Sequence, residues 1–167
     1  MSIEVVREYL KTFGKDGDIQ EFTESSATVE LAAQRLGVEP ARIAKSISLY
    51  GDAPGRGILV ITAGDAKIDN GKFREQFSCK AKMLKPEDVL TYTGHAVGGV
   101  CPFVNPDTLA VYADVSMRRF STVFPACGSA NSAIEMTCDT LFKIAKALEW
   151  VDVCKLPLNS ENDVVNI

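Results

Sequence analysis

Apolar residues recur at intervals of three and four positions in three segments of this chain, and this spacing predicts three amphipathic helices. The helices are expected over residues 2–13, 27–36 and 137–149. The faces expected to be buried are Val6, Tyr9, Leu10 and Phe13 in the first helix, Val29, Ala32, Ala33 and Leu36 in the second, and Leu141, Ile144, Ala145 and Leu148 in the third.

Short polar side chains indicate where these helices begin, because a hydroxyl or carboxylate oxygen can accept a hydrogen bond from a free N–H group of the first turn. Ser25 or Ser26 is expected to cap the second helix, and Thr137 the third. Asp69 is expected to cap a shorter helix that reaches Phe77.

Alternation of polar and apolar residues predicts a strand over 43–50, and the apolar run 58–61 predicts a central strand that is buried on both faces. Further strands are expected at 19–22, 82–84, 109–114, 123–124 and 133–136, with a short helix over 86–92. Helices and strands mix without strict alternation, so we expect a fold of the mixed α/β (α+β) class, built as one domain around one sheet.

Lys45 is the charged member of an otherwise apolar strand face that also carries Ile43, Ile47 and Leu49. A lysine in such a place must extend to solvent at the end of the strand, pair with an acidic group, or stand in a pocket. The pattern alone leaves these three readings open.

The composition describes an ordinary globular protein of 167 residues, with 46% hydrophobic and 24% charged residues. No apolar run approaches the roughly 18–20 residues that a membrane span requires. The net charge of −4 argues against a protein that holds nucleic acid by bulk charge, although it permits brief contact with a small part of an RNA.

The five cysteines are scattered and form no C-x-x-C pair, and the chain has one histidine, so no metal site is expected. The first residues lack the basic and apolar segments of a secretion signal. We therefore expect reduced thiols, a cytoplasmic location and no cofactor.

The segment from Gly94 to Pro102 gathers three glycines, a proline, the histidine His95 and the cysteine Cys101 within nine residues. Glycines allow close approach of a ligand to the main chain, and proline restricts the residue before it to extended angles. Such a loop can present backbone N–H groups to a carbonyl oxygen or an oxyanion, although glycine and proline also occur in ordinary turns.

Five short motifs occur in an order that resembles the YbaK/EbsC-type aminoacyl-tRNA deacylases, which are related to the editing domain inserted in prolyl-tRNA synthetases. The motifs are Ala32-Ala33-x-x-Leu36-Gly37-Val38, Ile43-Ala44-Lys45-Ser46, Ala63-Gly64-Asp65-x-Lys67-Ile68-Asp69, Gly98-Gly99-Val100-Cys101-Pro102-Phe103, and Ala126-x-Gly128-Ser129 through Ile134-Glu135-Met136. The resemblance implies an editing domain over residues 1–156 with a curved, mixed sheet surrounded by helices, followed by a polar tail over 157–167.

The resemblance also implies trans-editing, which is hydrolysis of the ester that joins a wrong amino acid to the 3′ end of a tRNA. The implied substrate is similar to Cys- or Ala-tRNA(Pro). The implied catalytic residues are Lys45, Gly98, Gly99, Val100 and Cys101, and the implied substrate-binding residues are Thr28, His95, Pro102, Phe103, Asp114, Gly128, Ser129 and Asn131. The expected partners are the tRNA acceptor end, bound weakly, and prolyl-tRNA synthetase, with no DNA and no membrane.

Several residues have a second reading. Cys101 with His95 could form the nucleophile and base of a cysteine hydrolase. Asp114 could orient Lys45 or cap the next turn, and Ser129 and Asn131 could be turn residues. Arg118 and Arg119 could contact phosphates of the acceptor stem or remain a solvated pair. A module that binds the tRNA end or a protein without catalysis is the alternative to an enzyme.

Overall fold

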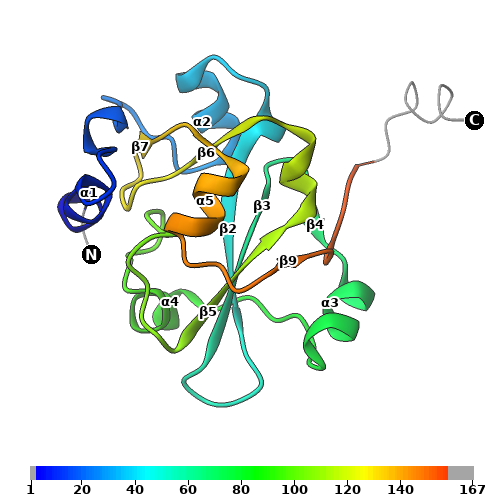
Figure 1. Cartoon of the computed structure of the whole chain (residues 1–167). Coiled ribbons are helices and arrows are strands. Elements are labelled where there is room, and N and C mark those ends of the chain that lie inside the picture. Colours follow the sequence, from blue (N-terminus) through cyan, green and yellow to red (C-terminus); the bar gives the residue numbers. More distant parts are fainter. Residues whose placement is uncertain (1–2, 158–167) are drawn as a thin grey trace, which may run out of the picture.

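The central feature of the fold is a six-stranded sheet with the order β8-β6-β2-β3-β5-β9 (Figure 1). The computed structural model describes residues 3–157. The sheet strands are β2 (Ile43–Tyr50), β3 (Gly57–Ala63), β5 (Leu109–Asp114), β6 (Thr122–Pro125), β8 (Met136–Thr137) and β9 (Trp150–Val151).

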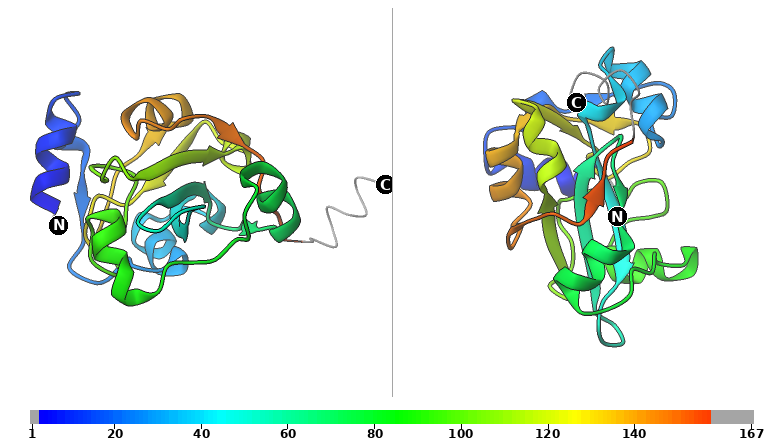
Figure 2. Two further views of the ribbon diagram at one scale, coloured as in Figure 1. Left: turned by 90° about the horizontal axis from the view of Figure 1, so that it is seen from below. Right: turned by 90° about the vertical axis from the view of Figure 1, so that its right-hand side faces the viewer.

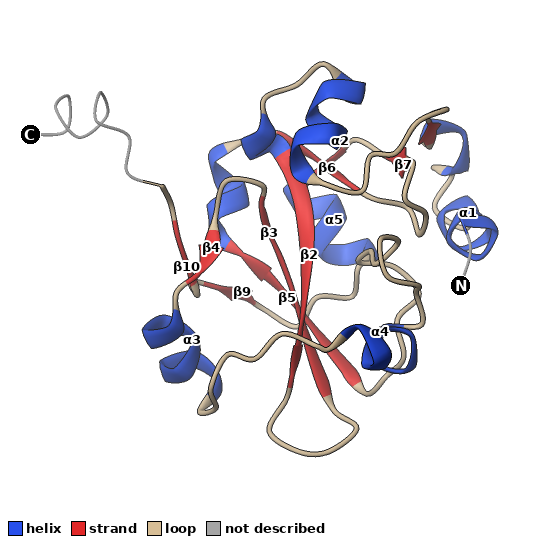
Figure 3. Ribbon diagram, turned by 180° about the vertical axis from the view of Figure 1, so that it is seen from behind, coloured by secondary structure: helices blue, strands red, loops and turns tan. Residues whose placement is uncertain are grey.

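The sheet is mixed, as expected. Strands β2 and β3 form an antiparallel hairpin, whereas β6 runs parallel to β2, and β5 runs parallel to β3. Strand β3 is buried along its whole length, which confirms the prediction of a central strand. The strands curve round instead of lying flat, and helices surround them (Figures 2 and 3). The fold class predicted from the sequence is therefore confirmed.

Two small ladders extend this framework, one joining β1 (Gln20–Glu21) to β7 (Ser132–Ala133) and the other joining β4 (Lys67–Ile68) to β10 (Cys154–Lys155). The single strand predicted over 133–136 is wrong, because the chain leaves β7 and enters β8, which pairs with β6 instead. The strand predicted over 82–84 is reduced to one bridge, between Met83 and Leu49.

The described residues include five α-helices and three short 3₁₀-helices. They are α1 (Ile3–Lys11), α2 (Val29–Leu36), α3 (Asn70–Phe77), α4 (Pro86–Thr93), α5 (Cys138–Ile144), η1 (Asp16–Asp18), η2 (Pro40–Arg42) and η3 (Val115–Arg119). None of the helices in this part of the chain has the length and apolar character needed to cross a bilayer.

Helix caps follow the local chemistry. Asp69 accepts a hydrogen bond from the Lys72 N–H, and Thr137 accepts one from the Thr140 N–H, as predicted. The cap predicted for α2 is wrong, since Thr28 accepts the bond from the Leu31 N–H. The Ser25 hydroxyl instead accepts a bond from the Ala27 N–H.

Two residues predicted to be buried are exposed, Phe13 by 41% and Leu148 by 64%. Both helices end before these positions, α1 at Lys11 and α5 at Ile144, so the helical spacing no longer applies. Lys146, between Ile144 and Leu148, adopts a positive φ of 55° that is incompatible with continuing the helix.

The predicted polar tail lies, apart from its first residue, outside the described residues.

Candidate active site

A cavity of about 260 Å³ lies against the first half of β2, where the start of α2 and two loops meet it. Its lining includes Thr28, Lys45, Gly98, Val100 and Ser129 from the predicted site, together with Ser46, Ser48 and Ser132. Among the described residues, the lining contains no carboxylate, imidazole or thiol. Lys45 is therefore the one ionisable side chain at this surface.

Lys45 is half-buried, and its Nζ donates a hydrogen bond to the Gly64 carbonyl at 3.3 Å. Burial lowers the pKa of Lys45, because desolvation disfavours the charged ammonium, while the carboxylates of Asp65 and Glu30 act in the opposite direction. No carboxylate of the described residues lies within ion-pair distance of its Nζ. Of the three readings left open by the sequence, the structure supports a lysine that stands in a pocket.

The Gly64 carbonyl belongs to a turn that has no room for a side chain. A Cβ at Gly64 would come within 2.1 Å of the Pro40 carbonyl oxygen and 2.8 Å of the Val29 side chain. A glycine is therefore required here, and the close packing holds the acceptor of the Lys45 ammonium in place.

The glycine loop opposite Lys45 contains a tight turn in which the Gly99 N–H donates to the Ala96 carbonyl at 2.9 Å. Gly98 occupies the third position of this turn with φ +89°, the conformation that type II turns reserve for glycine. The N–H of Gly99 is thus already used. The N–H groups of Gly98 and Val100 donate to no other group in the described part of the chain, and both residues line the cavity.

The loop also packs closely against the segment that follows β6. A Cβ at Gly99 would lie only 3.0 Å from the Gly128 carbonyl oxygen, so the two main chains approach each other directly. Gly128 itself has φ +93°. Ser129, the next residue, lines the cavity, and its hydroxyl donates to that of Ser132 at 2.7 Å.

Three other predicted residues do not line the cavity. Asn131 donates through Nδ2 to the Phe22 carbonyl at 2.7 Å and so ties this segment to the chain before α2. Pro102 lines a separate cavity, and Asp114 caps η3, accepting from the N–H groups of Ser116 and Val153 at 2.9 Å each. The capping alternative for Asp114 is confirmed.

His95, Cys101 and Phe103 are fully buried behind the glycine loop. His95 Nε2 lies 2.7 Å from the Phe103 carbonyl oxygen, which can only accept, so Nε2 carries the proton. Cys101 Sγ is 3.5 Å from the same nitrogen, and burial raises the pKa of the Cys101 thiol to about 12. A neutral thiol beside a nitrogen that already donates elsewhere is not an activated nucleophile.

Comparison with known proteins places this geometry in a family. The model of the family "Aminoacyl-tRNA editing domain" matches residues 23–144, which include every element of the cavity. The chain belongs to the aminoacyl-tRNA editing domain family. The resemblance identified in the sequence motifs is thereby confirmed.

The chain is also similar to individual proteins. The chain is 52% identical over 155 residues to "Uncharacterized protein YwhH" of Bacillus subtilis, covering 93% of this chain and 98% of that protein. It is 24% identical over 124 residues to the "Putative Cys-tRNA(Pro)/Cys-tRNA(Cys) deacylase EbsC" of Enterococcus faecalis, covering 74% and 75% of the two chains. The structure described as "Crystal structure of a putative trans-editing enzyme for prolyl tRNA synthetase" matches with a TM-score of 0.80 and 27% identity, covering 92% of this chain and 96% of that one.

The sequence analysis did not identify Ser46 and Ser48, which line this editing-domain cavity together with Ala44. The alternation along β2 places these residues on the face opposite Lys45, yet residues of both faces line the cavity. The Oγ of Ser46 is buried without a hydrogen-bond partner among the described residues. Met83 also lines the cavity, and nothing in the sequence except its place in a short apolar segment indicates this.

Proposed function

We propose that this protein is an aminoacyl-tRNA deacylase that acts in trans, hydrolysing the ester between a wrong amino acid and the terminal ribose of a tRNA. The observation that carries the proposal is the meeting of one ammonium, on Lys45, with unused N–H groups of Gly98 and Val100 at a single small cavity. Membership of the editing-domain family supports the same reaction.

In the proposed reaction, a water oxygen adds to the ester carbonyl carbon. The bond from that carbon to the ribose oxygen then breaks, and the ribose oxygen leaves with a proton. The N–H groups of Gly98 and Val100 stabilise the negative charge that develops on the carbonyl oxygen, a contribution worth about 10²–10³ in rate for one such donor. Lys45 holds the terminal phosphate or the ester oxygen as a compact charge.

No nucleophilic side chain is required in this scheme, because an aminoacyl ester is already activated. The neighbouring ribose hydroxyl of the substrate, a group that RNA supplies, would orient the attacking water. This agrees with a cavity whose described lining lacks thiol and imidazole groups. The buried Cys101 then serves as packing behind the loop.

The small volume of the cavity favours small amino acids, and selection would operate as a second sieve that admits only small misacylated products. The amino acids proposed are cysteine and alanine on a tRNA(Pro)-like acceptor. The relative named for Cys-tRNA(Pro) supports the choice of cysteine, and the structure named for prolyl-tRNA synthetase supports the synthetase as a partner. We place this activity in the cytoplasm as part of the same proposal.

The test is single-turnover deacylation of labelled Cys-, Ala- and Pro-tRNA by the wild type, Lys45→Ala and Lys45→Arg, with thermal melting of each protein. Lys45→Ala should lose about 100-fold or more in rate while its melting temperature is unchanged, because a half-buried ammonium contributes little to folding. Lys45→Arg should restore only part of the rate, since a planar fork replaces a compact ammonium.

Cys101→Ala is the variant that separates the proposal from a cysteine hydrolase, and it should keep its rate within about threefold, because no covalent step depends on the thiol. Loss of about 10⁴-fold with a trapped acyl-enzyme would overturn the proposed mechanism. A wild type that shifts tRNA in a gel but leaves every ester of the panel intact would establish the non-catalytic binding module instead.

A further inference from the structure

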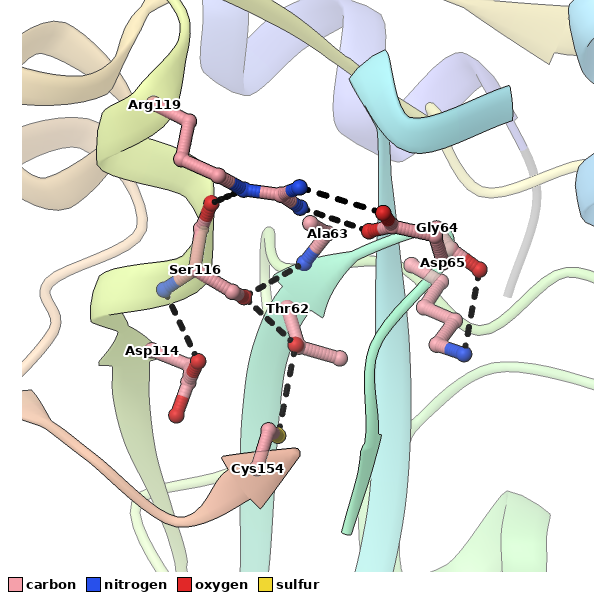
Figure 4. A network of polar contacts seen from close by, with 9 residues as sticks. Thr62, Ala63, Gly64, Asp65, Asp114, Ser116, Arg119 and Cys154 are labelled. Carbon is pink, nitrogen blue, oxygen red and sulfur yellow. Dashed lines mark hydrogen bonds and ion pairs between the residues drawn. The ribbon is translucent and has the colours of Figure 1, made fainter. Parts of the chain in front are cut away.

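A network of polar contacts joins η3 to the end of β3 and to the turn that carries Gly64, the residue whose carbonyl accepts from Lys45 (Figure 4). Its centre is Ser116 of η3, which is buried and whose Oγ accepts from the Ala63 N–H at 3.1 Å. The same Oγ lies 3.0 Å from the hydroxyl of Thr62, and the Thr62 hydroxyl lies 3.3 Å from Cys154 Sγ. Asp114 anchors the network by accepting from the Ser116 N–H.

The exposed end of the network is an ion pair between Arg119 and Asp65. The guanidinium contacts both carboxylate oxygens, Nη1 to Oδ2 at 3.1 Å and Nη2 to Oδ1 at 2.6 Å. Arg119 is itself held, because its Nε donates to the Ser116 carbonyl at 2.8 Å. Two parallel bonds from a planar fork fix an orientation better than a single contact does. Arg119 is therefore not part of a solvated arginine pair.

These contacts hold the chain on both sides of Gly64. Through Ser116, η3 binds the main chain of Ala63, and through Arg119 it binds the side chain of Asp65. Gly64 lies between these two residues, and its carbonyl accepts the hydrogen bond from Lys45 Nζ. The acceptor that directs the ammonium is thus clamped by a helix that does not itself line the cavity.

We propose that Asp65 and Arg119 are positioning residues for Lys45, which aim its ammonium into the cavity by fixing the Gly64 carbonyl and which balance the charge beside it. This inference concerns the site of the proposed deacylase and rests on that function for its effect on rate. Neither residue touches the substrate in this scheme.

Charged groups from three elements act on the ammonium of Lys45. Glu30 of α2 and Asp65 of the turn favour the ammonium, and Lys67 of β4 opposes it. Cys154 of β10 also lies nearby, but burial raises the pKa of its thiol to about 12, so it is neutral at physiological pH. Arg119 neutralises Asp65, which is its one ion-pair partner among the described residues.

Opposite effects on Lys45 are therefore expected from the two halves of the ion pair. Asp65→Asn removes a negative charge beside Lys45 and leaves Arg119 uncompensated, so the pKa of Lys45 should fall. Arg119→Gln leaves Asp65 uncompensated, so the pKa of Lys45 should rise. A purely structural role for the pair would move both variants in the same direction or in neither.

The experiment measures the pKa of Lys45 by following the Cε resonances of isotope-labelled lysines through a pH titration, with Lys45→Ala assigning the signal. Single-turnover deacylation is measured in parallel across pH for wild type, Asp65→Asn, Arg119→Gln and Arg119→Lys. Arg118→Gln, in the adjacent position of η3, is the matched control, because Arg118 contacts Asp139 and the Trp150 ring instead.

We expect both single variants to lose about tenfold or more in rate, as small displacements of a catalytic group commonly cause. The pH above which the rate falls should be lower than in the wild type for Asp65→Asn and higher for Arg119→Gln. Arg119→Lys should recover part of the rate, and Arg118→Gln should match the wild type. Shifts of Lys45 in the same direction, no shifts, or shifts with unchanged rates would overturn the inference.

The titration separates this inference from the proposed function. If the wild type hydrolyses no ester but the two variants shift the pKa of Lys45 in opposite directions, the proposed deacylase is wrong and the charge balance around Lys45 stands. If the wild type is active and the variants behave like Arg118→Gln, the deacylase stands and the positioning role is wrong.

Discussion

Burial acts on Lys45, His95 and Cys101 in the same physical sense, because in each case it favours the neutral form. The chemical results differ with the surroundings. Lys45 keeps an acceptor for its ammonium in the Gly64 carbonyl and opens on the cavity, whereas Cys101 has only buried neighbours. His95 has one bonded nitrogen and one, Nδ1, without a partner in the described part of the chain. The residue able to act is thus the one whose charge remains both supported and accessible.

His95 should make the stability of this protein depend on pH. Burial lowers the pKa of His95 in the folded state, so the unfolded state binds more protons once the pH falls below the ordinary histidine value of 6.5. The contribution of neutral His95 is fully present above that value and is lost as the pH falls toward the lowered pKa of the folded state. Denaturant unfolding at pH 7.5 and 5.5 should show a smaller loss of unfolding free energy for His95→Gln than for wild type.

The glutamine is suitable because its amide can still donate to the Phe103 carbonyl while it does not titrate. The absolute stability of the variant is not the test, since replacing a buried side chain has its own cost. Equal losses of stability for the two proteins between these pH values would mean that His95 is already accessible to protons in the folded state.

At the scale of elements, the cavity depends on two loops that carry strained or crowded glycines. The turn from Ala96 to Gly99 and the segment after β6 approach so closely that a side chain at Gly99 would press on Gly128. The hairpin between β2 and β3 contains a turn of the same kind, from Ala53 to Arg56, with Gly55 at φ +80° in the third position. This second turn lies outside the cavity lining and provides an internal comparison.

Gly98→Ala should cost about 1–2 kcal/mol of stability, because a Cβ is disfavoured at positive φ. Gly55→Ala should cost a similar amount, since nothing lies within 4 Å of either added methyl group except Ala130 at 3.9 Å from Gly98. The rates should differ: we expect deacylation to fall about tenfold or more only in Gly98→Ala, because the strained φ shifts the turn whose N–H is proposed to bind the oxyanion. Equal rates in both variants, measured in a single turnover beside thermal melting, would remove Gly98 from the proposed mechanism.

At the scale of the whole molecule, charge limits what this protein can hold. With 18 basic and 22 acidic residues, the chain has a net charge of −4. Several of its arginines are also engaged with acids within the described structure, among them Arg7, Arg35, Arg42 and Arg119. Affinity for a polyphosphate follows the number of phosphates neutralised, so contact with tRNA should be confined to the end that is proposed to enter the cavity.

We expect uncharged tRNA to bind with a dissociation constant no tighter than about 1 μM at physiological salt, with a shallow dependence on salt concentration. A minihelix that contains only the acceptor stem should bind equally well, because the rest of the tRNA would make no contact. Filter binding or fluorescence anisotropy over a salt series measures both quantities. Nanomolar binding of the full tRNA with a steep salt dependence would reveal a basic surface that the net charge conceals.

The sequence by itself determined most of the local structure of this protein. Strands β2 and β5 occupy the predicted residues 43–50 and 109–114, and the caps at Asp69 and Thr137 are as expected. These features depend on neighbours in the chain, through alternation, turn residues and hydrogen bonds from a side chain to the next turn. Lys45 was identified in the same way, as a charge within an apolar pattern.

Only the tertiary structure decided which segments meet. It paired β7 and β8 with different strands, brought Gly99 against Gly128, and joined Asp65 to Arg119 across 54 positions of the chain. It also buried Cys101 behind the loop that its sequence neighbours present to the cavity. The physical reason is that such contacts arise from packing and main-chain approach between distant segments, whereas a residue pattern reports only the preferences of its own segment.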